Sequence, residues 1–166
     1  TLTPTTPPPT TTTFVFDFIR HYLAFHLIKS QTKFDKTKEI LMINKEWDPN
    51  LTPEQNYVLK QEGTESPGSS HLNNEKREGS YYCVGCGTKL FDSSSKYESG
   101  SGWPSFFKSM PNVFEEKTDM NIGYPRTEYH CKKCGGHHGH IFDDGPKPTG
   151  KRYCNNGVCL VFKPKS

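Results

Sequence analysis

The sequence predicts a small, mainly β domain that folds around a bound metal, and three observations support this fold class. From Tyr81 onward, short apolar runs alternate with Gly- and Pro-rich turns, a pattern typical of small antiparallel sheets. Two Cys-x-x-Cys pairs, Cys83 with Cys86 and Cys131 with Cys134, have the spacing of a zinc site. Hydrophobic residues make up only 31% of the 166 residues, so part of the chain is not expected to pack, and a metal would help to stabilise the rest.

The first part of the chain is predicted to lie outside the folded domain, which we expect over residues 44–166. Residues 1–13 are almost only Thr and Pro, a composition typical of disordered segments. Residues 14–28 are apolar but short and interrupted by charges, so they indicate either a targeting peptide or sequence upstream of a start at Met42. We find no complete secretory signal and no apolar run long enough to cross a bilayer. We therefore expect a cytoplasmic location, or a mitochondrial or other organellar one if residues 1–43 are a targeting segment.

A short helix is expected at the start of the domain. The run Leu51–Gln55 places Thr at the N-cap, Pro at the first helical position and Gln at the third, which is a capping box. Val58 and Leu59 supply an apolar stripe together with Tyr57. The helix should stop by Gly63, because glycine readily takes the left-handed conformation that ends helices.

The remainder is predicted to be loop over residues 64–80 and β structure after that. Strands flank the two cysteine pairs, and a turn-rich loop at residues 143–150 joins two further strands. The predicted strands lie at residues 81–84, 89–91, 128–131, 140–142, 152–154 and 159–162.

The two cysteine pairs supply four thiolates, a set that completes a tetrahedral zinc site and leaves no position for water or substrate. We therefore expect one structural Zn²⁺ per chain. Gly85, Gly87, Gly135 and Gly136 suit the two turns, which need residues that tolerate a positive φ. Disulfides or free thiols are the alternatives, and iron could occupy the same cage. The spacing favours the metal and a reducing compartment.

Cys154 lies in a segment whose residue types favour a reactive thiol. In a strand, Arg152, Cys154 and Asn156 point to the same side. A guanidinium group near a thiol favours the thiolate, and an amide can position a substrate oxygen. His137 and His140 could face one side of a tight turn and act as general acids. The segment lacks an obvious set of partner residues for acyl transfer. A cysteine beside general acids therefore indicates redox chemistry as much as hydrolysis.

From about Trp47 to Phe162, the sequence closely resembles the B-type methionine sulfoxide reductases. The shared motifs keep the order and spacing of that family over some two thirds of the chain. They are Leu51–Gln55, Gly63–Glu65, Cys83-x-x-Cys86-Gly87, Ser99–Phe106, Cys131-x-x-Cys134, His137-x-Gly139-His140-x-Phe142, Asp144–Pro146, Thr149-Gly150 and Arg152-Tyr153-Cys154-x-Asn156.

The resemblance implies a mainly β fold of two small antiparallel sheets around a zinc site, and reduction of the R epimer of methionine sulfoxide. Cys154 matches the family nucleophile, which attacks the sulfoxide sulfur while a protonated imidazole gives a proton to the oxygen. The products are a sulfenic acid and methionine. His137, His140 and Asn156 match active-site positions, and Trp103 matches the aromatic wall that receives the substrate methyl group.

Two positions depart from the family pattern. His138 stands where Leu is common, which we interpret as a tolerated change on the turn. Ser101 occupies the place of the resolving cysteine of many members, and a hydroxyl cannot form a disulfide with Cys154. Cys159 is the other candidate, but five residues of strand span about 16 Å, and a disulfide needs Cα atoms within about 7 Å. Because side chains alternate along a strand, Cys159 would also point to the face opposite Cys154, unless Gly157 forms a bulge. We predict that Cys159 is a core residue.

The implied partners are oxidised proteins carrying methionine-R-sulfoxide and an external thiol, thioredoxin or a small molecule, that reduces the sulfenic acid. No nucleic acid partner is expected, since the net charge is only +3 and the basic residues are scattered among acidic ones. No membrane partner is expected either, since no apolar run is long enough to cross a bilayer. We also expect a monomer. One alternative is a non-catalytic zinc-knuckle binding module, which would leave the Cys154 segment unexplained. Another is a zinc hydrolase or deaminase, which the fully thiolate metal site argues against.

Overall fold

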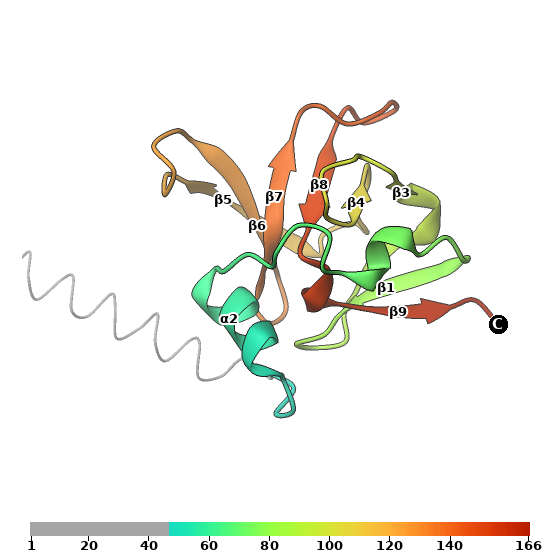
Figure 1. The fold of residues 1–166 in the computed structure, drawn as a ribbon, viewed down its shortest axis with the longest axis horizontal. Helices are drawn as coiled ribbons and strands as arrows, with labels where there is room; N and C mark the ends of the chain where they lie inside the picture. The colour runs from blue at the N-terminus through green and yellow to red at the C-terminus, as the bar shows by residue number, and fades with distance from the viewer. Residues whose placement is uncertain (1–46) are drawn as a thin grey trace, which may run out of the picture. The chain divides into compact units, whose positions relative to one another are not determined.

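Two antiparallel sheets form the framework of residues 47–166, the part of the chain that the computed structural model describes (Figure 1). The smaller sheet has the strand order β2-β1-β9 and the larger one β3-β4-β8-β7-β6-β5. The mainly β fold predicted from the sequence is therefore confirmed. The strands are β1 (Gly79–Cys83), β2 (Lys89–Asp92), β3 (Lys96–Tyr97), β4 (Ser105–Phe106), β5 (Phe114–Asp119), β6 (Arg126–Cys131), β7 (His137–Phe142), β8 (Arg152–Asn155) and β9 (Leu160–Pro164). Short 3₁₀ helices cover His71–Asn74, Ser93–Ser95 and Gly157–Cys159.

The predictions for residues 1–43 lie outside the described residues. The domain boundary at residue 44 and the location of the protein therefore stay predictions. Within residues 47–166, no helix has the length and apolar character needed to cross a membrane.

Helix α2 (Pro53–Gln61) begins with the predicted capping box. The Gln55 backbone N–H donates to Thr52 Oγ1 at 3.2 Å, and the Thr52 N–H donates to Gln55 Oε1 at 2.9 Å. These bonds satisfy backbone donors that the first turn leaves free. The C-terminal end differs from expectation: Glu62, with φ of 57°, takes the left-handed position, one residue before Gly63.

One face of α2 packs on the end of the chain. Val58 and Leu59 are buried, and they form a small core cluster with the fully buried Cys159. The predicted core position of Cys159 is thus confirmed. Tyr57 is 49% exposed, so its assignment to the apolar stripe was wrong. Burial of each aliphatic side chain stabilises the domain by about 1.5–3 kcal/mol, which holds α2 against the 3₁₀ turn that carries Cys159.

The main core is aromatic and lies between the two sheets. Phe91 of β2 stacks on Phe106 of β4, with ring centroids 4.1 Å apart. Tyr153 of β8 reaches the same core, where its ring lies 5.9 Å from Phe91 and 5.5 Å from Tyr129. Because neighbouring side chains in a strand point to opposite faces, the core position of Tyr153 turns Cys154 to the other side of the sheet.

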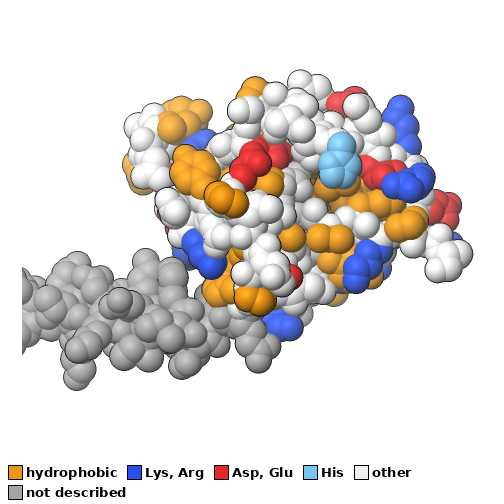
Figure 2. All heavy atoms as spheres, turned by 60° about the horizontal axis from the view of Figure 1, so that its bottom comes forward, with side chains coloured by type: hydrophobic (Ala, Val, Ile, Leu, Met, Phe, Trp, Pro, Cys, Tyr) orange, Lys and Arg blue, Asp and Glu red, His pale blue; other side chains and the backbone are white. Residues whose placement is uncertain are grey.

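Charged side chains of both signs lie on the face of the molecule drawn in Figure 2. Figure 2 shows blue and red groups interspersed with white and orange over one face, without a continuous basic patch on that face. This distribution agrees with the low net charge of +3. A nucleic-acid interface would gather basic side chains on one face. The absence of a nucleic-acid partner stays a prediction.

Candidate active site and metal centre

The four paired cysteines come together at the turns between β1 and β2 and between β6 and β7. Their ligand atoms all lie within 4.8 Å of one another. Cys83 Sγ lies 3.7 Å from Cys134 Sγ, and Cys86 Sγ lies 3.6 Å from Cys131 Sγ. A tetrahedral zinc ion with Zn–S bonds of about 2.3 Å requires sulfur separations of about 3.8 Å. The observed separations therefore fit a closed, four-thiolate metal site.

Two of the four turn glycines have the predicted conformation and two serve a different purpose. Gly87 and Gly135 have φ of 72° and 74°, the left-handed region that favours glycine. Gly85 and Gly136 do not have positive φ. A Cβ on Gly136 would come within 2.7 Å of the Leu59 side chain, and one on Gly85 would lie 3.1 Å from the Trp47 ring. These two glycines are thus required by close packing against the α2 region.

His138 lies beside the metal centre, and its interpretation as a residue on a turn was wrong. It belongs to strand β7 and is fully buried. Its Nε2 lies 3.4 Å from Cys83 Sγ. Burial lowers the pKa of His138 to about 3, so the ring is neutral at pH 7. A neutral Nε2–H can donate to the cysteine sulfur, which is the kind of outer contact that orients metal ligands.

A β-bulge brings two histidines of β7 to the same face. Strand β6 pairs Glu128 with His140 and His130 with His137, and the register shifts between Tyr129 and His130. In a regular strand, residues three apart point to opposite faces of the sheet. The extra residue that the bulge adds to β7 puts His137 and His140 on the same face. The rings of His137 and His140 are consequently 5.5 Å apart. The sequence predicted a shared side on a tight turn, whereas the structure achieves it within a bulged strand.

Cys154 opens into a small cavity of about 110 Å³. It pairs with His140 across β7 and β8, so both side chains rise from the same face. Gly139 allows this close approach, since a Cβ there would lie 2.0 Å from the Cys154 carbonyl oxygen. The residues lining the cavity are Thr64, Trp103, Arg126, Gly139, His140, Phe142, Cys154 and Asn156.

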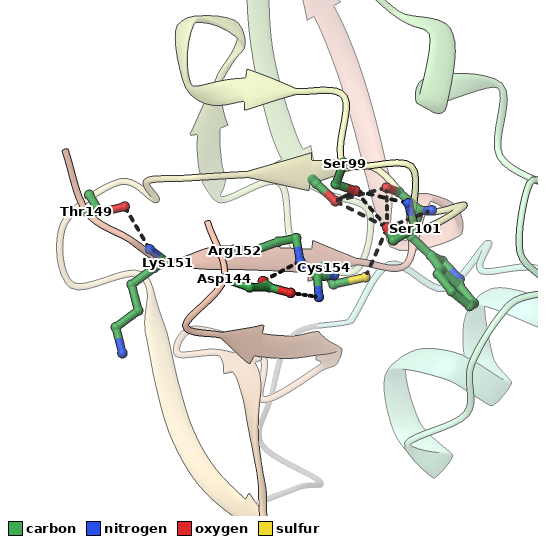
Figure 3. A network of polar contacts seen from close by, with 9 residues as sticks. Ser99, Ser101, Asp144, Thr149, Lys151, Arg152 and Cys154 are labelled. Atoms are coloured by element: carbon green, nitrogen blue, oxygen red, sulfur yellow. Dashed lines mark hydrogen bonds and ion pairs between the residues drawn. The ribbon is translucent and has the colours of Figure 1, made fainter. Parts of the chain in front are cut away.

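Burial and the neighbouring polar groups shift the pKa of Cys154 in opposite directions. Burial raises the pKa above its ordinary value, while the Ser101 hydroxyl and the Arg152 guanidinium lower it in part. Ser101 Oγ lies 3.8 Å from Cys154 Sγ, as Figure 3 shows. The Arg152 guanidinium donates twice to the Asp144 carboxylate, at 2.7 and 2.8 Å, and lies over the Phe142 ring. The Arg152 guanidinium therefore acts to lower the Cys154 pKa, but its charge is shared with Asp144 and burial outweighs it. Its role as thiolate stabiliser stays a prediction.

His140 is held by an acidic partner that the sequence analysis missed. Its Nε2 lies 2.9 Å from Asp119 Oδ2, and Arg126 contacts the same carboxylate at 2.5 Å. The Asn121 backbone N–H, His140 and Arg126 together lower the pKa of Asp119 to about 2. Because the carboxylate only accepts, Nε2 carries the proton toward it. Asp119 and Arg126 pair across the β5–β6 hairpin, and that pairing was the one available sequence signal.

Of the remaining predicted site residues, Trp103 and Asn156 line the cavity and His137 does not. Trp103 lines the cavity, and its Nε1–H donates to the Glu65 carbonyl at 3.1 Å. Asn156 also lines it, but its amide is engaged: Oδ1 accepts the Glu65 N–H and Nδ2 donates to the His138 carbonyl, both at 3.0 Å. His137 is buried and does not line the cavity; its Nδ1 lies 3.4 Å from a Glu128 carboxylate oxygen.

Glu65 is a second residue that the sequence analysis did not single out for a role. Its carboxylate accepts the backbone N–H groups of Gly157 at 2.6 Å and Val158 at 2.8 Å. Burial nevertheless raises its pKa. Through these bonds Glu65 connects the loop beside Trp103 to the chain that follows Cys154. Its place in the Gly63–Glu65 motif was a signal of importance, but its partners are 92 and 93 residues away.

Comparison with known proteins agrees with this geometry. Residues 51–164 match the SelR domain family. The chain is 47% identical over 126 residues to a peptide methionine sulfoxide reductase MsrB of Leptospira interrogans, covering 75% of this chain and 96% of that protein. It is 48% identical over 127 residues to an MsrB of Methanosarcina barkeri, covering 76% and 89%. It is 46% identical over 127 residues to a chloroplastic peptide methionine sulfoxide reductase B1 of Arabidopsis thaliana, covering 76% and 63%. The chain therefore belongs to the MsrB family of peptide methionine sulfoxide reductases.

Proposed function

We propose that this protein reduces methionine-R-sulfoxide, in proteins or as the free amino acid, to methionine. The observation that carries the proposal is the pairing of Cys154 with His140 across one small cavity, with Trp103 in its wall. A nucleophilic sulfur, a proton donor and an apolar wall are the three elements that attack on a methyl sulfoxide needs.

Cys154 is the proposed nucleophile and His140 the proposed acid. The cysteine sulfur attacks the sulfoxide sulfur to form a sulfur–sulfur bond, and His140 gives a proton to the oxygen. The hydroxyl then passes from the substrate sulfur to the Cys154 sulfur, which breaks the sulfur–oxygen bond of the substrate and the new sulfur–sulfur bond. The oxygen ends on Cys154, so that one thiol and one sulfoxide yield one sulfenic acid and one thioether. Asp119 stabilises the protonated imidazole through its contact of 2.9 Å, as carboxylates do for catalytic histidines.

The other predicted site residues support this pair. Trp103 is the proposed contact for the substrate methyl group. Arg152 stabilises the thiolate from its place beside Asp144. Asn156 is a positioning residue, because its amide joins the Glu65 and His138 backbones beside the cavity. His137 packs behind His140, with ring centroids 5.5 Å apart, and supports the acid from there.

We further propose that an external thiol, either thioredoxin or a small molecule, reduces the sulfenic acid. Two external thiols would convert it back to the Cys154 thiol and water and become one disulfide. Ser101, the side chain that contacts Cys154, has no sulfur to form an internal disulfide. Cys159 lies in the α2 cluster, and burial raises its pKa well above the ordinary thiol value, which makes it a poor nucleophile.

Zn²⁺ is the proposed occupant of the four-cysteine site. Four thiolates leave no open coordination position, so the ion would stabilise the knuckle turns and take no part in turnover. Elemental analysis of the purified protein distinguishes zinc from iron. We also propose that oxidised proteins are the substrates and that the protein is a monomer.

The function is tested by following the loss of each methionine sulfoxide epimer by chromatography, with dithiothreitol as reductant. We expect turnover of the R epimer alone, none with Cys154→Ser, and a decrease of about 10²- to 10⁴-fold with His140→Gln. His71→Gln is the matched control, because His71 is exposed and away from the cavity. Loss of neither epimer would favour a non-catalytic zinc-binding module. Normal turnover by Cys154→Ser would refute the assignment.

A further inference from the structure

Glu128, His130 and His137 form a buried cluster, of which the proposed chemistry uses only His137, through its packing behind His140. All three side chains rise from the bulged pairing of β6 and β7 described above. Their relative exposures are 7%, 3% and 1%. Their ligand atoms lie within 4.8 Å of one another, and the cluster is separate from the four cysteines.

The hydrogen bonding of His130 leaves its second ring nitrogen facing a carboxylate. His130 Nδ1 lies 3.1 Å from the Gly135 carbonyl oxygen, which can only accept, so Nδ1 carries the proton. The other ring nitrogen, Nε2, lies 3.1 Å from Glu128 Oε1. Within residues 47–166, His130 Nε2 and both nitrogens of His137 have no hydrogen-bond partner.

We propose that Glu128, His130 and His137 bind a second divalent transition-metal ion, with Zn²⁺ as the expected occupant. Two imidazoles and one carboxylate are a common ligand set for zinc and for other first-row divalent ions. Bonds of about 2.1 Å that meet at 90–110° require ligand atoms about 3.0–3.4 Å apart. The observed separations are 3.1 Å from His130 Nε2 to Glu128 Oε1 and 3.4 Å from His137 Nδ1 to Glu128 Oε2.

The surroundings of the cluster supply what such a site requires. A ligating histidine usually donates its other N–H to a backbone carbonyl, and the bond from His130 to Gly135 has this form. Three protein ligands leave a coordination position open for water or for a fourth side chain. Glu62, at the end of α2, is suited to this role: its Oε1 lies 4.0 Å from His130 Nε2, and its side chain is 46% exposed. That exposure also gives an ion a route from solvent.

The proposal is tested by adding Co²⁺ to the full-length protein in which the four-cysteine site already holds its metal. We expect one additional Co²⁺ per chain by calorimetry. Its visible bands should lack the near-ultraviolet thiolate charge transfer that marks cobalt bound to cysteine. His130→Gln should weaken this binding by more than about 100-fold, because loss of a direct ligand exceeds the effect of an outer contact. His71→Gln, on an exposed 3₁₀ turn, should bind as the wild type does.

Two results would overturn the proposal. If the wild-type protein, with its metal only at the four cysteines, binds no further Co²⁺, the three side chains do not form a metal site. If His130→Gln binds Co²⁺ as tightly as the wild type, the additional ion binds elsewhere on the chain. Should His130→Gln fail to fold, X-ray absorption of the cobalt-loaded wild type decides, since two imidazole ligands are expected and their absence refutes the site.

Discussion

Substitution of Ser101 by Cys is expected to give this protein an internal route for reducing Cys154. Ser101 Oγ lies 3.8 Å from Cys154 Sγ, whereas a disulfide needs its sulfurs about 2 Å apart. A small rotation of the new side chain, helped by the glycines on either side of residue 101, should close this gap. After one turnover the new thiol would attack the Cys154 sulfenic acid, which forms the disulfide and releases water.

The magnitude follows from the loop that the disulfide closes. About 50 residues separate the two positions, so restriction of the unfolded chain would stabilise the oxidised variant by about 4 kcal/mol in the absence of strain. For a domain of this size that corresponds to a rise in melting temperature of about 10–20 °C over the reduced variant. The wild-type protein treated in the same way should show no such rise.

The assay is oxidation of the Ser101→Cys variant with one equivalent of methionine-R-sulfoxide, followed by peptide mapping and thermal unfolding. We expect a disulfide between residues 101 and 154 in the variant, and a sulfenic acid that reacts with dimedone in the wild type. Ser99→Cys is the control, because Ser99 belongs to the same hydroxyl cluster but makes no contact with Cys154 in Figure 3. A variant that keeps a dimedone-reactive Cys154 and forms no disulfide would refute the geometric reasoning.

Two further predictions concern the thiol and the metal. Alkylation of Cys154 by iodoacetamide should accelerate as pH rises, with a midpoint above that of a free cysteine, because burial raises the pKa of the thiol. Arg152→Met should move the midpoint higher still, because the guanidinium lowers that pKa. A midpoint below that of free cysteine would contradict this reasoning. Removal of the metal from the four cysteines by a strong chelator should unfold the domain. Structural zinc contributes about 10 kcal/mol or more in small domains, as much as their whole stability, so an unchanged circular dichroism spectrum and melting temperature would argue against a structural ion.

The elements that could be predicted from the sequence depend on local rules. The capping box at Thr52 and Gln55 needs only residues three apart, and it forms as expected. The strands beside the cysteine pairs follow from short apolar runs between turns. Tyr57 and Glu62 show where local rules stop. The exposure of Tyr57 depends on what α2 packs against, and Glu62 takes the left-handed position although glycine follows it.

The site could be predicted in its residue types but not in its arrangement. Cys154 and His140 were expected together, and they face one another across β7 and β8. Asp119, which holds His140, was not expected, because it reaches the imidazole only through the pairing of β5, β6 and β7. His138 was expected on a turn but lies in β7. Which way its side chain points depends on the β-bulge in β7, and the local sequence does not reveal that bulge.

The sequence by itself determined the chemistry that this protein carries: four cysteines spaced for one metal, a cysteine beside basic and imidazole groups, and a serine in place of the family's resolving cysteine. These features are read from residue identity and spacing. Only the tertiary structure decided which groups act together. It buries Cys154, which raises the pKa of the thiol, joins His140 to Asp119, and gathers Glu128, His130 and His137 into one buried cluster. The physical reason is that burial and charge pairing depend on strand register, and register is set by contacts between residues far apart in the chain.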